Sequence, residues 1–301
     1  MIVVVGESLV DLVPNGADAL SVHCGGSPFN TARALARLGQ PVSFLGCISE
    51  DSLGRRLRAA LGADGVALES VISTPLPTTL AFAELDADGV ASYRFYIEGT
   101  SAPSLGAATA LKALPSEFDA LHFGSLGLML EPLAEAVGAV VEAGASRGVL
   151  TVFDPNIRPS MVSDRARYVA RLDRVLSRTD VVKASTDDLA WLEPGVAPDL
   201  VARHLLDRGP RIVLLTRGAE GATVLSSDGA ATVASPRVTV VDTIGAGDAF
   251  SAGFLAWWRH RGLGREALSD LDTVAEAARF ACLVASRTVE QPGATPPRMQ
   301  L

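Results

Sequence analysis

The sequence predicts a Rossmann-like α/β fold in three α/β/α layers, with a small second β-sheet as a lid. Strand patterns alternate with helix patterns along most of the chain, as a parallel sheet with crossover helices requires. Apolar runs such as Ile2–Val5 end in glycine or polar residues, which is typical of buried parallel strands. A β-hairpin pattern near residues 79–98 interrupts this alternation and predicts the separate sheet.

The same patterns place the other elements of the main sheet and its helices. We expect further strands at residues 42–45, 120–123, 150–153, 181–183, 212–216, 222–225, 230–233 and 238–241, and helices at 31–38, 52–61, 131–147, 249–258 and 273–288.

The composition is that of a folded protein with a large core. Of 301 residues, 48% are hydrophobic and 20% are charged, and the formal net charge is −8. No basic tract is present, so we expect no nucleic acid and no membrane partner. No apolar run is long enough to span a bilayer. Residues 1–301 show no linker, repeat or second core and are predicted to form one domain.

The cysteines predict neither a disulfide framework nor a zinc site. Cys24, Cys47 and Cys282 are widely spaced, with no Cys-x-x-Cys pair and only four histidines in the chain. Reduced, mostly buried thiols in a cytoplasmic protein are the expectation. The apolar start at Met1–Gly6 has no basic n-region and is predicted to be a strand rather than a signal peptide.

Two stretches in the first half are candidates for binding a polyol. Asp11 follows the first strand, on the side of an α/β sheet where ligands gather, although a surface loop would also accommodate it. Gly25 and Gly26 let a ligand approach the backbone, and Asn30 offers both a donor and an acceptor. An ordinary glycine-rich helix entry is the alternative.

The lid is predicted from two groups of extended segments, near residues 12–23 and 79–98. The hairpin has strands at 79–85 and 91–96 and a turn at 86–89. A closing lid would keep water from a reactive phosphate. Arg94, Phe95 and Tyr96 are candidates to reach a substrate from the lid, and hairpin alternation explains them equally well.

Val241–Phe250 is the stretch around which the chain is organised. It follows a β-branched run and precedes an apolar helix, so it is predicted to be strand, glycine turn and helix start. Gly245, Ala246 and Gly247 leave backbone N–H groups free to converge on a phosphate at the positive end of the helix. Asp248 directly follows and would remove a proton from a hydroxyl that attacks this phosphate; capping of the helix is the alternative.

Two motifs together resemble the signatures of the PfkB-type, or ribokinase-like, carbohydrate kinases. Asp242–Phe250 is similar to the C-terminal signature, and Gly25–Asn30 with its helix is similar to the N-terminal one. The resemblance covers nearly the whole chain, and bacterial fructokinases are the most similar subgroup. It implies a ribokinase-like fold, ATP and Mg²⁺ as cosubstrate and cofactor, and a homodimer formed through the lid.

The resemblance also implies roles for individual residues. Asp11, Gly25, Gly26, Asn30, Phe95 and Arg158 would bind the sugar, and Asp248 would act as the base beside Gly245, Ala246 and Gly247. Lys183, Thr216, Gly218, Gly221, Cys282 and Ser286 would bind the nucleotide. Asp188 would reach Mg²⁺ through water. The chain departs from the family here, because it has Ser185-x-x-Asp188 where relatives often carry Asn-x-x-Glu. Ser185 would serve equally well as an N-cap. Asp242 and Ile244, with Gly293–Thr295, would hold a monovalent cation such as K⁺.

The function predicted from this resemblance is transfer of the γ-phosphoryl group of ATP to a primary hydroxyl of a small sugar, with fructose first. A 2-keto-3-deoxygluconate kinase is the alternative, because Arg94 and Arg158 are able to pair with a carboxylate. A ribokinase or nucleoside kinase shares the same framework. A non-catalytic sugar- or nucleotide-binding regulator is the alternative from a different class. The sequence has no P-loop motif, so we expect it to bind the nucleotide in a different way from the P-loop proteins.

Overall fold

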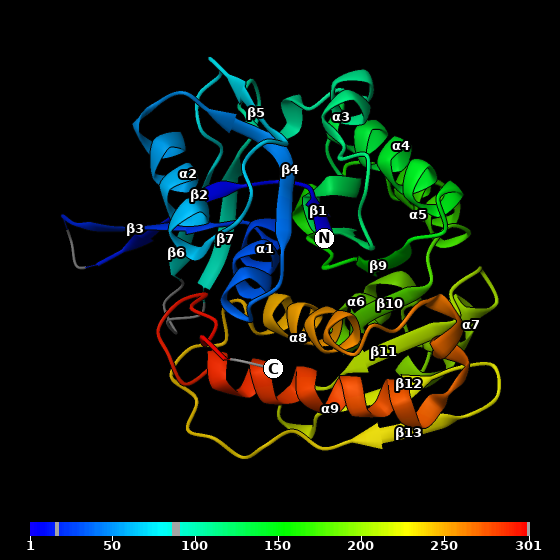
Figure 1. Ribbon diagram of the computed structural model, residues 1–301. Coiled ribbons are helices and arrows are strands. Elements are labelled where there is room, and N and C mark those ends of the chain that lie inside the picture. Colours follow the sequence, from blue (N-terminus) through cyan, green and yellow to red (C-terminus); the bar gives the residue numbers. More distant parts are fainter. Residues whose placement is uncertain (16–17, 86–90, 300–301) are drawn as a thin grey trace.

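The computed structural model describes residues 1–15, 18–85 and 91–299, and within them the main feature is a nine-stranded sheet (Figure 1). Its spatial order is β13-β12-β11-β10-β9-β8-β1-β4-β5. Strands β11 to β5 along this order are parallel, and β12 and β13 are antiparallel additions at one edge. The strands are β1 (Ile2–Val5), β4 (Val42–Ser49), β5 (Val71–Thr74), β8 (Ala120–Gly124), β9 (Leu150–Asp154), β10 (Val181–Ser185), β11 (Ile212–Thr216), β12 (Ala222–Leu225) and β13 (Ala230–Val233).

Both faces of this sheet are covered by helices, which confirms the three-layer prediction. In β1, Ile2 and Val4 pack into the core on one face, and Val3 and Val5 pack into the core on the other. Such burial on both faces explains why the strands read as continuous apolar runs. One face carries α1 (Ser27–Arg37), α2 (Ser52–Asp64), α8 (Ala246–His260) and α9 (Leu271–Thr288). The other carries α3 (Ala107–Ala113), α4 (Leu133–Ser146), α5 (Arg165–Leu176), α6 (Thr186–Leu192) and α7 (Pro198–Leu206).

The small sheet stands apart from the main sheet, as Figure 1 shows for its strand β3. Its order is β3-β2-β6-β7, from β2 (Leu9–Pro14), β3 (Leu20–Gly25), β6 (Leu80–Leu85) and β7 (Ala91–Tyr96). The two segment groups expected to form the lid therefore pair with each other, β2 with β6. The turn predicted at residues 86–89 lies outside the described residues.

One strand prediction was wrong. Residues 238–241 form no strand, and the side chains of Val240 and Val241 are 56% and 59% exposed. The β-branched run favours an extended backbone, but β13 already occupies the edge of the sheet and none of the described strands pairs with this segment. The backbone N–H of Val241 donates instead to the carbonyl of Val289, at the end of α9. The glycine turn is thus reached from a loop rather than from a strand.

The helix of the N-terminal motif also begins earlier than predicted. α1 starts at Ser27, with Gly26 as its N-cap at φ 107°, so Ser27 and Asn30 lie in its first turn. Pro28 fits this first turn because its missing N–H would have no partner there. In the part of the chain that the structure describes, no helix is long and apolar enough to cross a bilayer.

Candidate active site

Two hollows meet at the glycine turn that begins α8. The first has a volume of about 320 Å³ and contains Asp248; the second, about 490 Å³, is lined mainly by apolar atoms. Thr243 and Gly247 line both hollows. A ligand in one hollow is therefore next to a ligand in the other, as a transfer reaction between two substrates requires.

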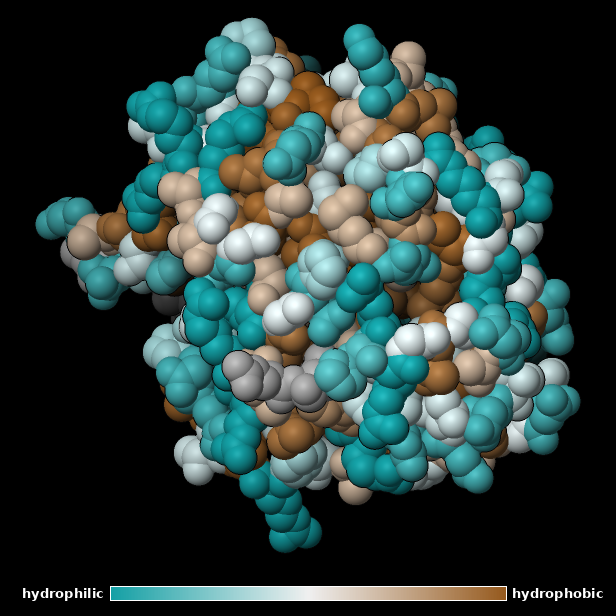
Figure 2. Space-filling model, viewed as in Figure 1, coloured by the Kyte–Doolittle hydropathy of each residue, from teal (hydrophilic) through white to brown (hydrophobic). Residues whose placement is uncertain are grey.

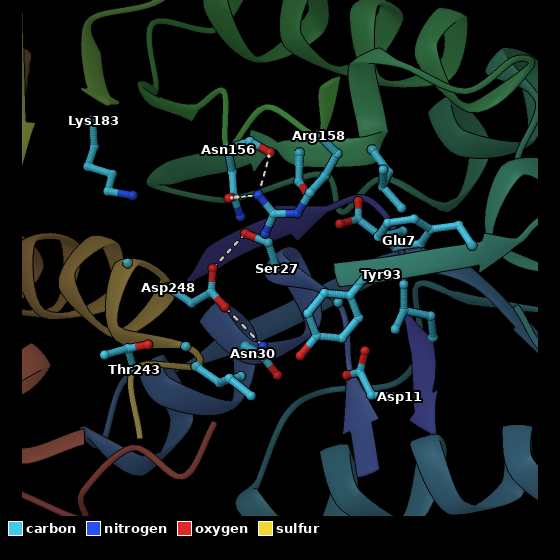
Figure 3. Close-up of a pocket in the computed structure, with 18 residues that line it drawn as sticks. Glu7, Asp11, Ser27, Asn30, Tyr93, Asn156, Arg158, Lys183, Thr243 and Asp248 are labelled. Atoms are coloured by element: carbon cyan, nitrogen blue, oxygen red, sulfur yellow. Dashed lines mark hydrogen bonds between the residues drawn. The ribbon is translucent and has the colours of Figure 1, made fainter. Parts of the chain in front are cut away.

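The first hollow brings together five of the six residues predicted to bind the sugar. Asp11, Gly26, Asn30, Phe95 and Arg158 line it. Gly25 does not line it, but a side-chain carbon there would overlap the carboxyl group of Asp11, so Gly25 makes room for that side chain. Burial raises the pKa of Asp11 to about 6, partly opposed by the charge of Arg158. Figure 3 shows Asp11 and Glu7 on one side of the hollow and Asp248 on the other.

Asp248 is held by the helix that the N-terminal motif begins. Its exposed fraction is 6%, and its Oδ1 accepts a hydrogen bond from Ser27 Oγ at 2.6 Å. Its Oδ2 accepts one from Asn30 Nδ2 at 2.9 Å (Figure 3). Burial raises the pKa of Asp248, and these two hydrogen bonds oppose the rise. A carboxylate that is fixed in place and more basic than usual is suited to accept a proton.

The glycine turn has the geometry predicted for binding an oxyanion. Gly245 is the N-cap of α8 at φ 77°, a left-handed backbone conformation that favours glycine, and no described side chain caps this end of the helix. The tail also packs here, because a side-chain carbon on Gly245 would lie 2.7 Å from Cβ of Ala294. The N–H groups of Gly247 and Asp248 have no acceptor four residues earlier within the helix, so they are available to a phosphate.

Lys183 lies directly beneath this turn. A side-chain carbon on Gly247 would be only 2.8 Å from Nζ of Lys183, so glycine is needed here for space rather than for its backbone angles. Nζ donates to Asp154 Oδ2 at 2.9 Å, and the two side chains are 6% and 1% exposed. Burial raises the pKa of Asp154 to about 6 although Lys183 opposes the rise. Burial lowers the pKa of Lys183, but nearby Asp154 outweighs this and raises it, so Lys183 keeps its positive charge.

Arg158 is oriented by a neighbour with an unusual backbone. Asn156 has φ 36°, and its Oδ1 accepts a hydrogen bond from Arg158 Nη1 at 2.6 Å (Figure 3). Both residues line the first hollow. Strained backbone often persists at functional sites, where it is retained for the position it gives a side chain. Here it holds a guanidinium group over the hollow.

The second hollow collects the residues predicted to bind the nucleotide, with one exception. Thr216, Gly218, Gly221, Cys282 and Ser286 all line it. Lys183 lines the first hollow instead, next to the shared Gly247. The remaining walls come from the loop after β13 and from α8 and α9, and include Pro236, Val238, Val240, Phe250, Ala285 and Val289. The exposed Val240 thus belongs to a pocket wall, where a flat apolar ring is able to pack.

Strand alternation decides which lid residues face the sugar hollow. Tyr93 and Phe95 line it, two residues apart on one face of β7. Arg94 and Tyr96 are on the opposite face, so the suggestion that they reach the substrate is corrected. Arg94 Nε donates to Glu84 at 2.7 Å, and Tyr96 is 54% exposed.

Asp188 has other partners than those predicted for it. Its Oδ1 accepts from the backbone N–H of Ile157 at 2.7 Å, and its Oδ2 accepts from both N and Oγ of Ser185. Ser185 and Asp188 form a capping box at the start of α6, which was the alternative given for Ser185. Asp188 lines neither hollow. It supports the loop that carries Arg158, and the magnesium role assigned to it stays a prediction without geometric support.

A protein-built magnesium site does not fit the described residues, because no three His, Cys, Asp or Glu side chains there cluster as metal ligands. Mg²⁺ commonly keeps several waters and is held by substrate phosphates with one or two carboxylates. By contrast, the residues predicted around a monovalent cation do come together. Asp242 accepts hydrogen bonds from the N–H groups of Ile244 at 2.9 Å and Gly293 at 2.7 Å.

Several residues of the first hollow were missed from the sequence. They are Glu7, Ser27, Tyr93, Ser125, Leu126 and Thr243. Ser27 and Thr243 belong to motifs that were recognised, and their neighbours were named. Glu7 directly follows the first strand, so the rule that ligands gather at strand ends applied to it as much as to Asp11. No local pattern marks Ser125.

The site has a buried carboxylate beside a turn of free amides, where a polar and an apolar hollow meet. This arrangement defines an enzyme that transfers a phosphoryl group to a hydroxyl. The chain belongs to the pfkB family of carbohydrate kinases, whose model matches residues 1–300. It is an ATP-dependent sugar kinase with the ribokinase-like fold.

Curated and solved relatives agree with this class. The chain is 41% identical over 260 residues to a fructokinase from Rhizobium leguminosarum bv. trifolii, covering 85% of this chain and 79% of the relative. The structure is similar to that of a Xylella fastidiosa fructokinase with bound ATP, with a TM-score of 0.90, 26% identity and coverage of 99% and 95% of the two chains. It is also similar to a Vibrio cholerae O395 fructokinase bound to fructose, ADP and calcium ion, with a TM-score of 0.89, 26% identity and coverage of 99% and 96%.

Proposed function

We propose that this kinase is a fructokinase that transfers the γ-phosphoryl group of ATP to a primary hydroxyl of fructose. The observation that carries this proposal is Asp248, which lines the first hollow next to the glycine turn shared by both and is held by Ser27 and Asn30. The sugar occupies the first hollow, and the nucleotide occupies the second, with its terminal phosphate at the shared glycine turn. Fructokinases among both the sequence relatives and the structural neighbours support this choice of sugar.

In this mechanism Asp248 accepts the proton of the attacking hydroxyl. Such general-base catalysis contributes about 10²- to 10⁴-fold. The N–H groups of Gly247 and Asp248 and the ammonium of Lys183 stabilise negative charge on the transferred phosphoryl group. Mg²⁺, held mainly by the nucleotide phosphates, supplies further positive charge when bound. Tyr93 and Phe95 on the lid exclude water from the sugar hollow.

The charges of the first hollow favour a neutral sugar over a sugar acid. Arg94, which was expected to help bind a carboxylate, faces away and pairs with Glu84. Arg158 and Lys183 remain, but Lys183 is paired with Asp154, and Asp11 and Asp248 line the same hollow. Like charges close together repel, so an anionic substrate would bind less well than fructose. A 2-keto-3-deoxygluconate kinase is therefore the weaker alternative.

An ADP-release assay with ATP and Mg²⁺ tests the proposal. The panel contains fructose, tagatose, ribose, 2-keto-3-deoxygluconate and adenosine. We expect the highest kcat/KM with fructose and a kcat about 10²- to 10⁴-fold lower in Asp248→Asn. The Asp248→Asn variant would still fold, because the buried Oδ1 of Asn30 has no partner and an amide flip would offer it to the new side chain. Asp248→Asn with normal turnover would refute the role of Asp248. ATP binding without turnover on any sugar would favour a regulator.

Three further features belong to this proposal. Residues 1–301 form one kinase domain with the small sheet as its lid, and the enzyme works in the cytoplasm, where ATP is available and its free cysteines stay reduced.

Asp242, Ile244 and Gly293 bind K⁺, so the same assay in Na⁺ buffer should give slower turnover; equal rates would exclude the ion. A homodimer forms through the lid, whose edge strands β3 and β7 carry the exposed residues Leu20 and Tyr96. Figure 2 shows apolar residues on the part of the molecule that projects at the left, where Figure 1 places β3. A monomeric mass in light scattering would exclude it.

A further inference from the structure

Glu7 is a buried carboxyl group with an unused oxygen. It follows β1, its exposed fraction is 1%, and it lines the sugar hollow. Its Oε2 has no hydrogen-bond partner among the described residues. The hydroxyl of Ser125, which also lines the hollow, is close enough to lower the pKa of this carboxyl group. An unpartnered buried oxygen of this kind costs free energy of folding, so its retention at a ligand hollow points to a partner supplied by the ligand.

The backbone around Glu7 leaves little freedom to move away. A side-chain carbon on Gly26 would lie 2.9 Å from the carbonyl oxygen of Glu7, so the start of α1 packs directly against this residue. The same helix turn carries Ser27 and Asn30, which hold Asp248. Ser125, which lines the hollow beside Glu7, has φ 52°, a left-handed backbone conformation like that of Asn156. Glu7 is therefore fixed relative to the base.

We propose that Glu7 contacts the sugar directly and that its Oε2 hydrogen-bonds a hydroxyl other than the one that is phosphorylated. Figure 3 shows Glu7 across the hollow from Asp248, so a sugar with one hydroxyl at Asp248 extends toward Glu7. This inference rests on the proposed function, because it assumes a sugar in this hollow. It makes Glu7 a residue that positions the substrate and does not take part in phosphoryl transfer itself.

The protonation of Glu7 gives this contact a pH dependence. Burial raises the pKa of Glu7 to about 7, helped by the charge of Asp248 and opposed by Ser125 and Arg158. Asp11, Tyr93 and Lys183 are the other titratable groups that line the hollow. Because the bound sugar excludes water, the neutral acid is the better partner; its O–H donates to a hydroxyl oxygen. The KM for the sugar should therefore rise as the pH increases through about 7.

The test compares Glu7→Gln and Glu7→Ala with wild type, using the sugar that the panel identifies. We expect Glu7→Ala to raise the sugar KM about 10- to 100-fold at pH 6, with a smaller effect on kcat and none on the KM for ATP. The difference from wild type should shrink toward pH 8.5, because the wild-type KM rises with pH. Glu7→Gln mimics the neutral acid, so its KM should equal that of wild type at pH 6 and stay flat to pH 8.5. Ser8→Ala is the matched control, because Ser8 is an adjacent buried side chain with an unpartnered Oγ that does not line the hollow.

Thermal unfolding separates this role from a structural one. If Glu7 is kept for the sugar, Glu7→Gln should unfold at the same temperature as wild type or higher at pH 8, where the native carboxyl is charged and buried. Two results would overturn the proposal and leave the kinase function intact. One is that Glu7→Ala has the same sugar KM as wild type, and the other is that Glu7→Gln has a KM as high as that of Glu7→Ala at pH 6. Absence of turnover on any sugar in wild type would overturn the proposed function and this inference with it.

Discussion

Gly247→Ala tests whether the space beneath the glycine turn is essential. The new methyl group would lie 2.8 Å from Nζ of Lys183 and 3.7 Å from its Cε. Contacts below about 3.0 Å are not tolerated by a side-chain carbon, so the ammonium must move by a few tenths of an ångström. Nζ is bound to Asp154 at 2.9 Å and both side chains are nearly fully buried. A shift of this size away from Asp154 lengthens the bond toward the usual limit of about 3.2 Å.

The magnitude follows from two opposing effects. Replacing a helix-interior glycine with alanine stabilises a helix by about 1 kcal/mol. Breaking a buried ion pair costs about 3–5 kcal/mol, and a stretched pair loses only part of that. We expect a net destabilisation of about 1–3 kcal/mol from these two principles. Misplacement of Lys183 relative to the phosphate should lower kcat about 10²-fold.

Chemical denaturation and the ADP-release assay measure the two effects. Gly138→Ala is the control, because Gly138 lies in the middle of α4 and a side-chain carbon there meets nothing within 4 Å. It should gain about 1 kcal/mol and keep its turnover. If Gly247→Ala were stabilised as much as Gly138→Ala and its kcat stayed within about twofold of wild type, the reasoning about Lys183 would be refuted.

Two further predictions concern buried and capping carboxylates. Asp51 caps α2 through Gly54 N at 2.7 Å and binds Thr78, and these hydrogen bonds outweigh burial and lower the pKa of Asp51 to about 2. Asp51→Ala should therefore cost about 1–2 kcal/mol at pH 7, and the difference from wild type in denaturant titrations should shrink as the pH falls from 3.8 toward 2; a constant difference would contradict this. Lys183→Met leaves Asp154 buried without its cation. Because the pKa of Asp154 is raised to about 6, this carboxyl group becomes charged between pH 5 and pH 8, and the loss of thermal stability should grow over that range. Adding Asp154→Leu should restore stability but not turnover; restored turnover would show that Lys183 is not needed at the phosphate.

Local sequence was sufficient for most strands of the main sheet and for the turn. Ile2–Val5 and Ile212–Thr216 are where their apolar runs predict them, because burial on both faces selects continuous apolar residues. Gly245 sits at a positive φ that favours glycine, so the turn is visible in the sequence itself. The motif resemblance named the family and the base.

Local sequence failed where a residue's environment comes from distant segments. Val238–Val241 has the composition of a strand, but without a neighbouring strand its backbone cannot form a ladder, and it lines the second hollow instead. Ser185 and Asp188 look like metal-linked residues by analogy, yet they satisfy each other at a helix start. The pairing of β7 with β6 decides which face of the hairpin points into the first hollow, and it is the face that carries Tyr93 and Phe95.

The sequence by itself determined the family, the α/β order of the elements, the anion-binding turn and Asp248, because each depends on residue type over a few adjacent positions. Only the tertiary structure decided which groups act together. Ser27 and Asn30 are 221 and 218 positions from Asp248 in the chain, and Lys183 of β10 reaches Gly247 at the start of α8. The burial of Glu7 likewise depends on Ser125 and on the start of α1. Burial, hydrogen bonding and charge at the site are properties of atoms that meet only when the chain folds, so no local pattern contains them.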